Sequence, residues 1–380
     1  MTTGGAGRVV VIRLADASPP DIERWWDLYG RAVEPHPNTA PAWILGAAST
    51  PHERDGLLLC VLQNGERWDA LLLAAVGTAV VARRSRPALS NDDGLLGDAT
   101  THRHPLLSGD DPAGALAALL RGLPRHVTPP VMRLAMMPLD GPSGDALVAG
   151  VRRSRRTAII DHTVDRRFLD QQDVTALSPP VATADYVRAL AGLGASTGHS
   201  LRRHANRLDR HGSAPLAVSD DTDRPGALDE FDELLNSGWK GDSGRGGASP
   251  RVRGVEAGWR ESIEAFQARG VLRLLSMRLD GRPAYMSLGV QAGATVFGFS
   301  DAYDEDLAQH RVGTLGRVVT AVEWLRRDDV TRYDPCMWPV NEEANRIYAS
   351  SRPFGTVTCA LRPGGAALLT LTKVKRRAGS

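Results

Sequence analysis

Residues 341–354 read Asn-Glu-Glu-Ala-Asn-Arg-Ile-Tyr-Ala-Ser-Ser-Arg-Pro-Phe, the stretch of this chain that says most about its fold. It lies between two apolar segments, 330–336 and 356–361, that we predict to be strands. We predict a helix over 341–350, in which Asn341 and Tyr348 are two turns apart and share one face. A phenol there can protonate a group of comparable basicity, such as a thiolate. The alternative is an ordinary amphipathic helix with a half-buried tyrosine.

A second informative stretch, residues 309–316, reads Gln-His-Arg-Val-Gly-Thr-Leu-Gly. It lies between a strand predicted over 295–301 and a helix predicted over 313–326. The first N–H groups of a helix have no acceptor within the helix, so with Arg311 beside them they form a favourable site for a pyrophosphate. Two glycines three residues apart are a weak signal alone. Their position before the helix that precedes residues 341–354 strengthens it.

Together the two stretches resemble the GCN5-related N-acetyltransferase (GNAT) superfamily. Its Asn-x-x-Ala-x-x-x-Tyr-x-x-x-Gly-Phe segment is matched at Asn341, Ala344, Tyr348 and Phe354, with Pro353 in place of the glycine. Its Gln/Arg-x-x-Gly-x-Gly/Ala loop is matched less well, because His310 and Leu315 stand at two of its positions. The resemblance implies that acetyl-CoA or another acyl-CoA is the co-substrate and that Tyr348 is the general acid. It also implies the following CoA-binding residues: Arg311, Val312, Gly313, Thr314, Gly316 and Asn341.

Further features, in chain order, are similar to the CelD/BcsL-type acetyltransferases, a GNAT branch related to the Fem aminoacyltransferases. They are Arg202-Arg203, Trp239-Lys240, the Asp280-Gly281 hairpin, residues 301–304, Gly313-Thr-Leu, Glu323-Trp324 and Tyr333-Asp334. Members of this branch have two GNAT-like domains, of which the second is better preserved. The resemblance therefore implies a mixed α/β (α+β) fold with two tandem domains. Each has a central, mostly antiparallel sheet whose fourth and fifth strands splay apart.

The sequence itself also indicates a duplication. Met136-Met137-Pro138 ends a predicted strand in the first half, and Met337-Trp338-Pro339 ends the corresponding one 201 residues later. At this offset Leu147, which has no proton to give, replaces Tyr348. We therefore expect a degenerate domain over 1–163, a polar linker over 164–184 and a catalytic domain over 185–380. We also predict that the chain finishes with a strand over 367–374.

The general base and the acceptor site are less clear. Asp301 and Asp334 end the predicted fourth and fifth strands of the second half, so either carboxylate is a candidate base, the alternative being a helix cap. Cys336 invites an acyl-enzyme interpretation, although cysteine is common in buried strands. We expect four residues to contact the acceptor: Trp239, Lys240, Asp242 and Tyr303.

Composition excludes several classes of protein. The 380 residues carry 46 Lys+Arg against 44 Asp+Glu, a net charge of +2, so the chain is no bulk polycation that coats nucleic acid. Its three cysteines are too widely spaced for a disulfide framework or a zinc knuckle, and its histidines show no metal-ligand spacing. We recognise no signal peptide and no apolar run of membrane-spanning length, and we expect a cytoplasmic monomer or homodimer without metal.

Three functions remain open at this point. The first is a CoA-dependent N-acyltransferase that transfers its acyl group directly to a primary amine of a small molecule. The second keeps the fold but takes the acyl group from aminoacyl-tRNA, with the arginines of 202–210 and the basic residues 373–377 holding RNA. The third is a non-catalytic binding protein built on two decayed GNAT domains. Tyr348 argues against the third, and the near-neutral net charge argues against the second.

Overall fold

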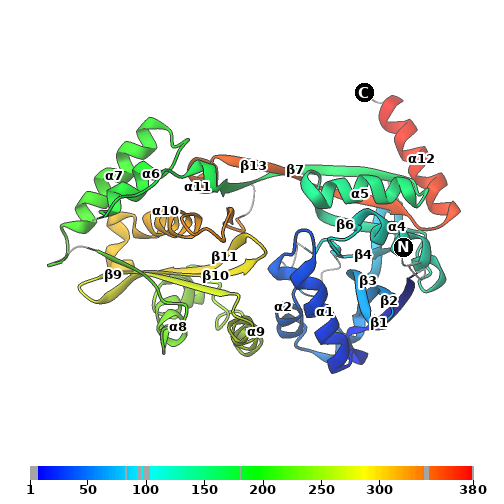
Figure 1. Cartoon of the computed structure of the whole chain (residues 1–380), viewed down its shortest axis with the longest axis horizontal. Coiled ribbons are helices and arrows are strands. Elements are labelled where there is room, and N and C mark those ends of the chain that lie inside the picture. Colours follow the sequence, from blue (N-terminus) through cyan, green and yellow to red (C-terminus); the bar gives the residue numbers. More distant parts are fainter. Residues whose placement is uncertain are drawn as a thin grey trace. The chain divides into compact units, whose positions relative to one another are not determined.

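The structure, a computed structural model, describes residues 7–81, 84–92, 96, 103–179, 181–214, 216–337 and 342–378. The chain forms two compact units. Unit 1 comprises Met1–Asp165 and Arg352–Ser380, and unit 2 comprises Arg166–Ser351 (Figure 1).

Unit 1 is built on a mixed sheet with helices on both faces (Figure 1). Its strand order is β1 (Arg8–Arg13), β2 (Leu57–Asn64), β3 (Arg67–Val81), β4 (Arg84–Ser90), β6 (Val131–Pro138), β13 (Ser350–Ala360) and β7 (Ala158–Asp170), with β5 (Leu106–Leu107) paired to β3. Strands β1 to β4 are antiparallel, whereas β4 and β6 are parallel. The helices of this unit are α1 (Pro19–Arg31), α2 (Pro41–Ala47), α3 (Pro51–Gly56), α4 (Pro112–Gly122), α5 (Gly141–Arg153) and α12 (Pro363–Ala378).

Unit 2 repeats this plan. Its strand order is β7, β12 (Arg332–Asp334), β11 (Thr295–Tyr303), β10 (Arg282–Ala292), β9 (Leu272–Leu279) and β8 (Ala217–Asp220). Its helices are α6 (Thr183–Ala189), α7 (Ala195–Asp209), α8 (Ala227–Ser237), α9 (Glu256–Ala268), α10 (Val312–Leu325) and α11 (Glu342–Ile347). Helix α10 lies on one face of the sheet with α6 and α7 outside it, and α8 and α9 lie on the other face (Figure 1).

Burial explains the central place of α10. Its sequence is apolar on nearly all sides, so it is buried between the sheet and α6, with Leu315, Val318 and Val322 inaccessible to solvent. Tyr186 of α6 donates a 2.5 Å hydrogen bond to Glu323 on the outer side of α10. The helix is therefore held on both sides, and its first turn has a fixed position at the end of β11.

The expected splay is present in both units. In unit 1 the parallel pairing of β4 with β6 ends at Ser90 and Arg133, although β6 continues to Pro138. In unit 2 the pairing of β11 with β12 ends at Phe297 and Asp334, although β11 continues to Tyr303. Met136 and Cys336, which follow these last pairs, have left-handed backbone angles with φ of 49° and 52°. The matching geometry supports the duplication.

The unit boundaries differ from the expected division at residues 163 and 185. Strand β7 continues to Asp170 and pairs with β12 of unit 2 through Leu169 and Asp170, so much of the expected linker is sheet. Beyond Arg352, strand β13 pairs with β6 of unit 1. The polar letters of 164–170 conceal a strand in which Arg166, Phe168 and Leu169 are buried, whereas Arg167 and Asp170 are partly exposed.

The strand expected over 367–374 is wrong, because these residues belong to helix α12. Pro363 stands at the start of this helix, where its missing N–H costs nothing, and Ala and Leu residues follow. Leu369 is inaccessible and packs in a small core with Val131 and Ala360. A single apolar run of this length does not distinguish a strand from a helix that is half covered.

Candidate active site

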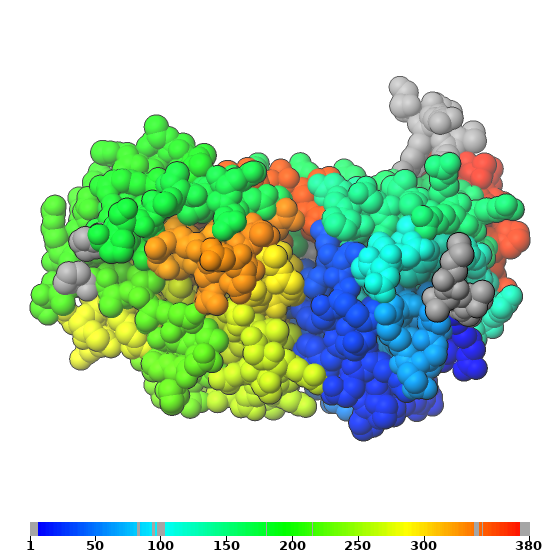
Figure 2. Space-filling model, viewed as in Figure 1, coloured from blue at the N-terminus to red at the C-terminus, as the bar shows by residue number. Residues whose placement is uncertain are grey.

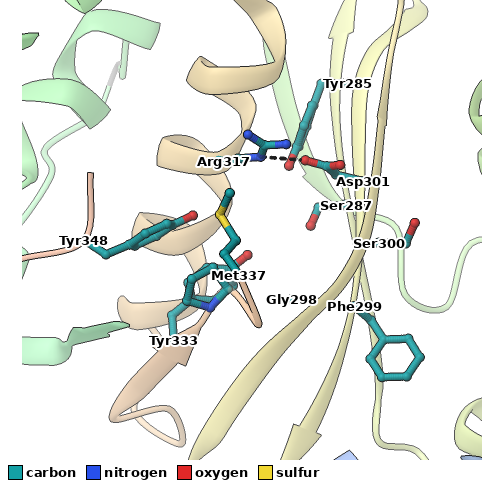
Figure 3. A pocket seen from close by; sticks show the side chains of 11 residues that line it. Tyr285, Ser287, Gly298, Phe299, Ser300, Asp301, Arg317, Tyr333, Met337 and Tyr348 are labelled. Atoms are coloured by element: carbon teal, nitrogen blue, oxygen red, sulfur yellow. Dashed lines mark hydrogen bonds and ion pairs between the residues drawn. The ribbon is translucent and has the colours of Figure 1, made fainter. Parts of the chain in front are cut away.

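A pocket lies in unit 2 where β11 and β12 diverge (Figure 3). The sheet, α10 and the chain around α11 all contribute side chains to it. Its lining consists of Tyr285, Ser287, Gly298, Phe299, Ser300, Asp301, Arg317, Tyr333, Pro335, Met337 and Tyr348. The parallel pairing of β11 with β12 has ended here, so side chains line the space between the two strands. Three of the lining side chains are phenols.

Tyr348 directly follows α11 and points into this pocket (Figure 3). Its side chain is 1% exposed, and its hydroxyl has no hydrogen-bond partner among the described residues. Its ring lies 6.2 Å from that of Tyr333, centroid to centroid. Burial raises the pKa of Tyr348 well above its usual value, so the phenol is protonated at neutral pH. An uncharged O–H without a partner is available to a group that enters the pocket.

Asp301 is held between two cations. Lys240 Nζ donates to its carboxylate at 2.5 Å and to its backbone carbonyl at 2.6 Å, while Arg317 Nε donates to the second carboxylate oxygen at 2.8 Å. Burial alone would raise the pKa of Asp301, but Lys240 and Arg317 outweigh that effect and lower it. The carboxylate is therefore ionised at neutral pH and already uses both oxygens.

Arg317 extends this network along α10. Its guanidinium binds Asp301 on one side and Glu343 of α11 on the other, and Thr314 also donates to Glu343. Three segments that are far apart in sequence are thus linked by alternating charges. Arg317 is the cation nearest the centre of this network, and it lines the same pocket as Tyr348 (Figure 3).

Asp334, the other candidate base, is not among the residues that line the pocket. It is 8% exposed, accepts a hydrogen bond from the buried Arg166 at 3.3 Å, and accepts the N–H of Cys336 at 2.7 Å. Burial raises the pKa of the Cys336 thiol to about 12, so it is protonated at neutral pH and a poor nucleophile. The geometry favours structural roles for both residues.

A second pocket adjoins the first turn of α10. Arg311, in a left-handed conformation with φ of 55°, precedes the helix and provides no side-chain cap. The pocket is lined by Ser196, Thr197, Ser200, Leu201, Arg311, Thr314, Glu343, Arg346 and Ile347. The N–H groups of this first turn therefore stand next to a space with a cation beside it, which is the arrangement that phosphate groups prefer.

The corresponding helix of unit 1 is closed to an anion. Asp111 caps α4 by accepting the N–H of Gly114 at 3.0 Å, and Arg153 pairs with the same carboxylate at 2.8 Å. A carboxylate thus already occupies the N-terminus of α4, whereas α10 has none among its cap residues. Leu147, at the position of Tyr348, is 4% exposed in the core of unit 1. Of the two units, only unit 2 combines an uncapped helix with a tyrosine in a pocket, among the residues described.

The other predicted site residues are distributed as follows. Val312 is buried in the core, and Gly313 and Gly316 face tyrosines of the sheet: a Cβ on Gly313 would lie 3.1 Å from the Tyr303 ring, and one on Gly316 would lie 2.3 Å from the Tyr285 ring. Tyr303 thus packs against α10. Asn341 lies outside the described residues.

The predicted acceptor residues on the loop after α8 are only partly gathered at the site. Lys240 reaches Asp301, and Trp239 lies beside it with the Lys240 ammonium 6.0 Å from its ring centroid. Asp242 is exposed and accepts the N–H of Gly244 at 2.8 Å. Sequence reasoning missed Arg317, Tyr285 and Met337, because a single arginine or tyrosine within an apolar element carries no local pattern.

The comparisons with known proteins agree with this geometry. The acetyltransferase (GNAT) domain family matches residues 195–338. This stretch is a GNAT domain. Residues 195–338 therefore form an acyltransferase domain of the GNAT superfamily. No curated protein sequence matches the chain.

Solved structures with a similar fold have low sequence identity to this GNAT protein. One is the C-terminal domain of a protein from Agrobacterium fabrum that is described as a lysylphosphatidylglycerol synthetase. It has a TM-score of 0.50 at 11% identity, and the alignment covers 93% of this chain and 95% of that chain. FemX has a TM-score of 0.50 at 8% identity, over 89% and 95%. A conserved protein from Bacteroides thetaiotaomicron has a TM-score of 0.50 at 12% identity, over 89% and 97%. These similarities concern the fold.

The described residues contain neither a metal-binding cluster nor a membrane-spanning helix. Among the described residues, no group of three or more His, Cys, Asp or Glu side chains is placed to hold a metal ion. Within the same part of the chain, no helix has both the length and the apolar character that a membrane span requires.

Proposed function

We propose that this protein is an N-acyltransferase that moves an acyl group, such as acetyl, from acyl-CoA directly to the primary amine of a small molecule. The observation that carries the proposal is the Tyr348 hydroxyl, which is buried, protonated and unpartnered among the described residues, and which points into the pocket between the splayed strands. An isolated buried hydroxyl is unfavourable for folding. Its retention at this position is explained by a partner that arrives with the substrate.

The donor binds, in this proposal, with its pyrophosphate at the first turn of α10. Arg311 and Thr314 of that turn line the second pocket, and Arg311 supplies its cation. The thioester then extends toward the splay, where the pocket opens between β11 and β12. Gly313 and Gly316 contribute by letting α10 approach the sheet closely, which fixes the position of the N–H groups.

The chemical step is an exchange of one acyl bond for another. The amine nitrogen, in its uncharged form, attacks the thioester carbonyl, and a C–N bond forms. As the tetrahedral intermediate collapses, the C–S bond breaks and the electron pair leaves with sulfur. Tyr348 donates its proton to that thiolate, and the proton that the amine loses returns to the phenolate directly or through water. No covalent acyl-enzyme is formed, consistent with the protonated thiol of Cys336.

Asp301 contributes to this step as an anchor. Its lowered pKa makes it a weak base, and both of its oxygens are occupied. We therefore assign it the role of holding Arg317 and Lys240 at the acceptor side of the pocket. The amine must then enter uncharged or lose its proton to water, and Asp334 remains the alternative base through a water-mediated path.

Donor class is the decisive experiment. Thermal denaturation of the full chain should shift upward with acetyl-CoA and with CoA, because both carry the pyrophosphate that α10 binds, and an Arg311→Ala variant should show a smaller shift. The matched control is Arg251→Ala, which removes an exposed arginine that pairs with Glu256 and does not line the pocket at α10. Stabilisation by an aminoacyl-tRNA and none by CoA would overturn the proposal in favour of tRNA-dependent amide formation.

Three free cysteines fit a reducing compartment, so we include action in the cytoplasm in the proposal. The acceptor would be a soluble amine.

A further inference from the structure

Helix α7 carries a basic stripe that continues from the pocket at α10. Ser196 and Ser200 line that pocket, and Arg203 and Arg207 follow them at helical spacing on the same side of α7. His211 lies in the turn just after this helix. The buried side of the helix is different and is formed by Leu201, Ala205 and Leu208. Helix α7 contacts α10, and the green surface of unit 2 adjoins the orange surface of α10 (Figures 1 and 2).

The segment that leads into α10 supplies the other half of the stripe. His310 and Arg311 end the short helix over Glu305–His310 and the turn after it. The rings of His211 and His310 lie 4.9 Å apart, centroid to centroid. His204 also lies among these groups, because its pKa is lowered by partial burial and then by the positive charges of Arg311, Arg203 and Arg207. We call this group of Arg203, His204, Arg207, His211, His310 and Arg311 the basic stripe.

The arginines of the basic stripe are not neutralised. Arg203, Arg207 and Arg311 form no ion pair with a carboxylate among the described residues, whereas Arg346, the other arginine that lines the pocket at α10, is paired with Glu342. Like charges held close together repel each other, so the stripe is unfavourable until an anion joins it. Unpaired arginines gathered next to a pocket indicate that the missing anion is a ligand.

Two imidazole nitrogens are also unused. His204 Nδ1 and His310 Nε2 are buried without a hydrogen-bond partner in the part of the chain that the structure describes. The pKa of His310 is lowered by burial and then by the charges of His211 and Arg207. Both imidazoles are therefore neutral near pH 7 and can take up a proton when an anion is bound beside them.

We propose that the basic stripe binds a phosphate monoester of the donor, separate from the pyrophosphate at α10, and that this group is the 3′-phosphate on the ribose of CoA. The inference rests on the proposed function. A phosphate monoester carries about −1.5 to −2 charges and three acceptor oxygens, which suits several arginines and imidazoles at once.

The dimensions favour a compact donor over a nucleic acid. Arg203 and Arg207 are four residues apart, so the helical part of the stripe extends only about 6 Å along α7. Arg311 belongs both to the stripe and to the pocket at α10, so one small molecule can reach both. An RNA backbone is bound by a longer track of cations.

The test compares CoA with dephospho-CoA, which lacks only the 3′-phosphate, by titration calorimetry on the full chain. We expect the wild type to bind CoA at least tenfold more tightly. In the double variant Arg203→Gln/Arg207→Gln, CoA affinity should fall to that of dephospho-CoA, while dephospho-CoA affinity should change less than twofold. Arg202→Gln is the matched control, because Arg202 lies on the opposite flank of α7, and it should retain the wild-type preference.

The outcomes separate the two proposals. Equal wild-type affinity for CoA and dephospho-CoA would overturn the basic-stripe assignment and leave the proposed function intact. A preference for CoA that survives in the double variant would also overturn the assignment. Binding of neither compound by the wild type would overturn both proposals. A short RNA that binds more tightly than CoA, and loses affinity in the double variant, would assign the stripe to RNA instead.

Discussion

Tyr348 is the residue on which the proposed chemistry depends, and its environment makes opposite predictions for activity and stability. Tyr348→Phe removes the proton source and should lower kcat by about 10²–10⁴-fold with little change in KM. The same change removes a buried hydroxyl that has no partner among the described residues, so the folded state should become more stable by about 1 kcal/mol. Steady-state kinetics and urea unfolding measure the two effects.

Tyr29 of unit 1 provides the matched control. It is 4% exposed and its hydroxyl also has no hydrogen-bond partner among the described residues. Tyr29→Phe should give a similar gain in stability and leave kcat unchanged. A Tyr348→Phe enzyme with kcat within a few-fold of wild type would remove Tyr348 from the mechanism.

Asp301 makes a prediction that depends on pH. Asp301→Asn leaves the charges of Lys240 and Arg317 without their partner and should lower the free energy of unfolding by about 3 kcal/mol at pH 7. Because the pKa of Asp301 is lower in the folded state, its contribution is complete above pH ~4 and is lost as the pH falls further. Urea unfolding of both proteins should therefore give a constant difference from pH 7 to pH 5 and a smaller one below pH 4.

Asp242→Asn is the control for that measurement, because Asp242 is exposed and caps only a short turn. It should cost less than about 1 kcal/mol at every pH. A difference between wild type and Asp301→Asn that grows as the pH falls would contradict the ion-pair interpretation.

At this scale the sequence identified the residues that stand in a recognisable order along the chain. Tyr348 and Asp301 were found because the Asn-to-Phe segment and a strand end have a local pattern. The helix expected over 341–350 is shorter, since α11 ends at Ile347 and Tyr348 follows it. Arg317 was missed, since its role comes from carboxylates 16 residues before it and 26 residues after it. Interactions between residues distant in sequence leave no periodicity to detect.

At the scale of elements, the contact between α10 and the sheet depends on Gly316. A Cβ at this position would lie 2.3 Å from the buried Tyr285 ring, so Gly316→Ala must displace either the ring or the helix. We expect a loss of about 1–3 kcal/mol in unfolding free energy and weaker CoA binding, because the first turn of α10 moves with the helix. Differential scanning calorimetry and CoA titration measure both.

Gly364→Ala is the corresponding control. Gly364 lies in the first turn of α12, and nothing lies within 4 Å of a Cβ there, so alanine should be neutral or stabilise by up to about 1 kcal/mol. If Gly316→Ala behaved like Gly364→Ala, the close approach of α10 to Tyr285 would not be a requirement of the fold.

Periodicity and turn residues predicted the hairpin at Asp280-Gly281, the strand around 295–301 and the helix around 313–326, all of which are present. The errors occurred where burial comes from a distant part of the chain. Strand β7 was missed because its letters are polar and its partners, β12 and β13, lie far away in the sequence. Helix α12 was taken for a strand because its apolar face covers only a small core.

At the scale of the whole molecule, unit 1 is incomplete without residues 352–360. Val357, Cys359 and Leu361 are buried in its main core, and β13 fills the position next to β6. A fragment of residues 1–165 should therefore fail to fold cooperatively alone, because the edge of β6 and this part of the core are exposed. Adding a peptide of residues 350–378 should restore a sigmoidal urea transition, monitored by circular dichroism.

The control is the same peptide with Val357→Asp, which places a charge in the core of unit 1 and should not restore folding. Cooperative unfolding of residues 1–165 without any peptide would show that β13 is dispensable. The duplication could be predicted from the sequence. That β13 pairs with β6 of unit 1 could not be predicted, because its place in chain order would also suit unit 2.

The position of β13 also sets the order in which the protein can be completed during synthesis. Residues 166–351 leave the ribosome before residues 352–360. Unit 2 can therefore finish folding while the sheet of unit 1 still lacks β13 between β6 and β7. The N-terminal half, although made first, matures last. During translation it is a substrate for chaperones that protect open strand edges, and a pause between codons 165 and 352 would prolong that exposure.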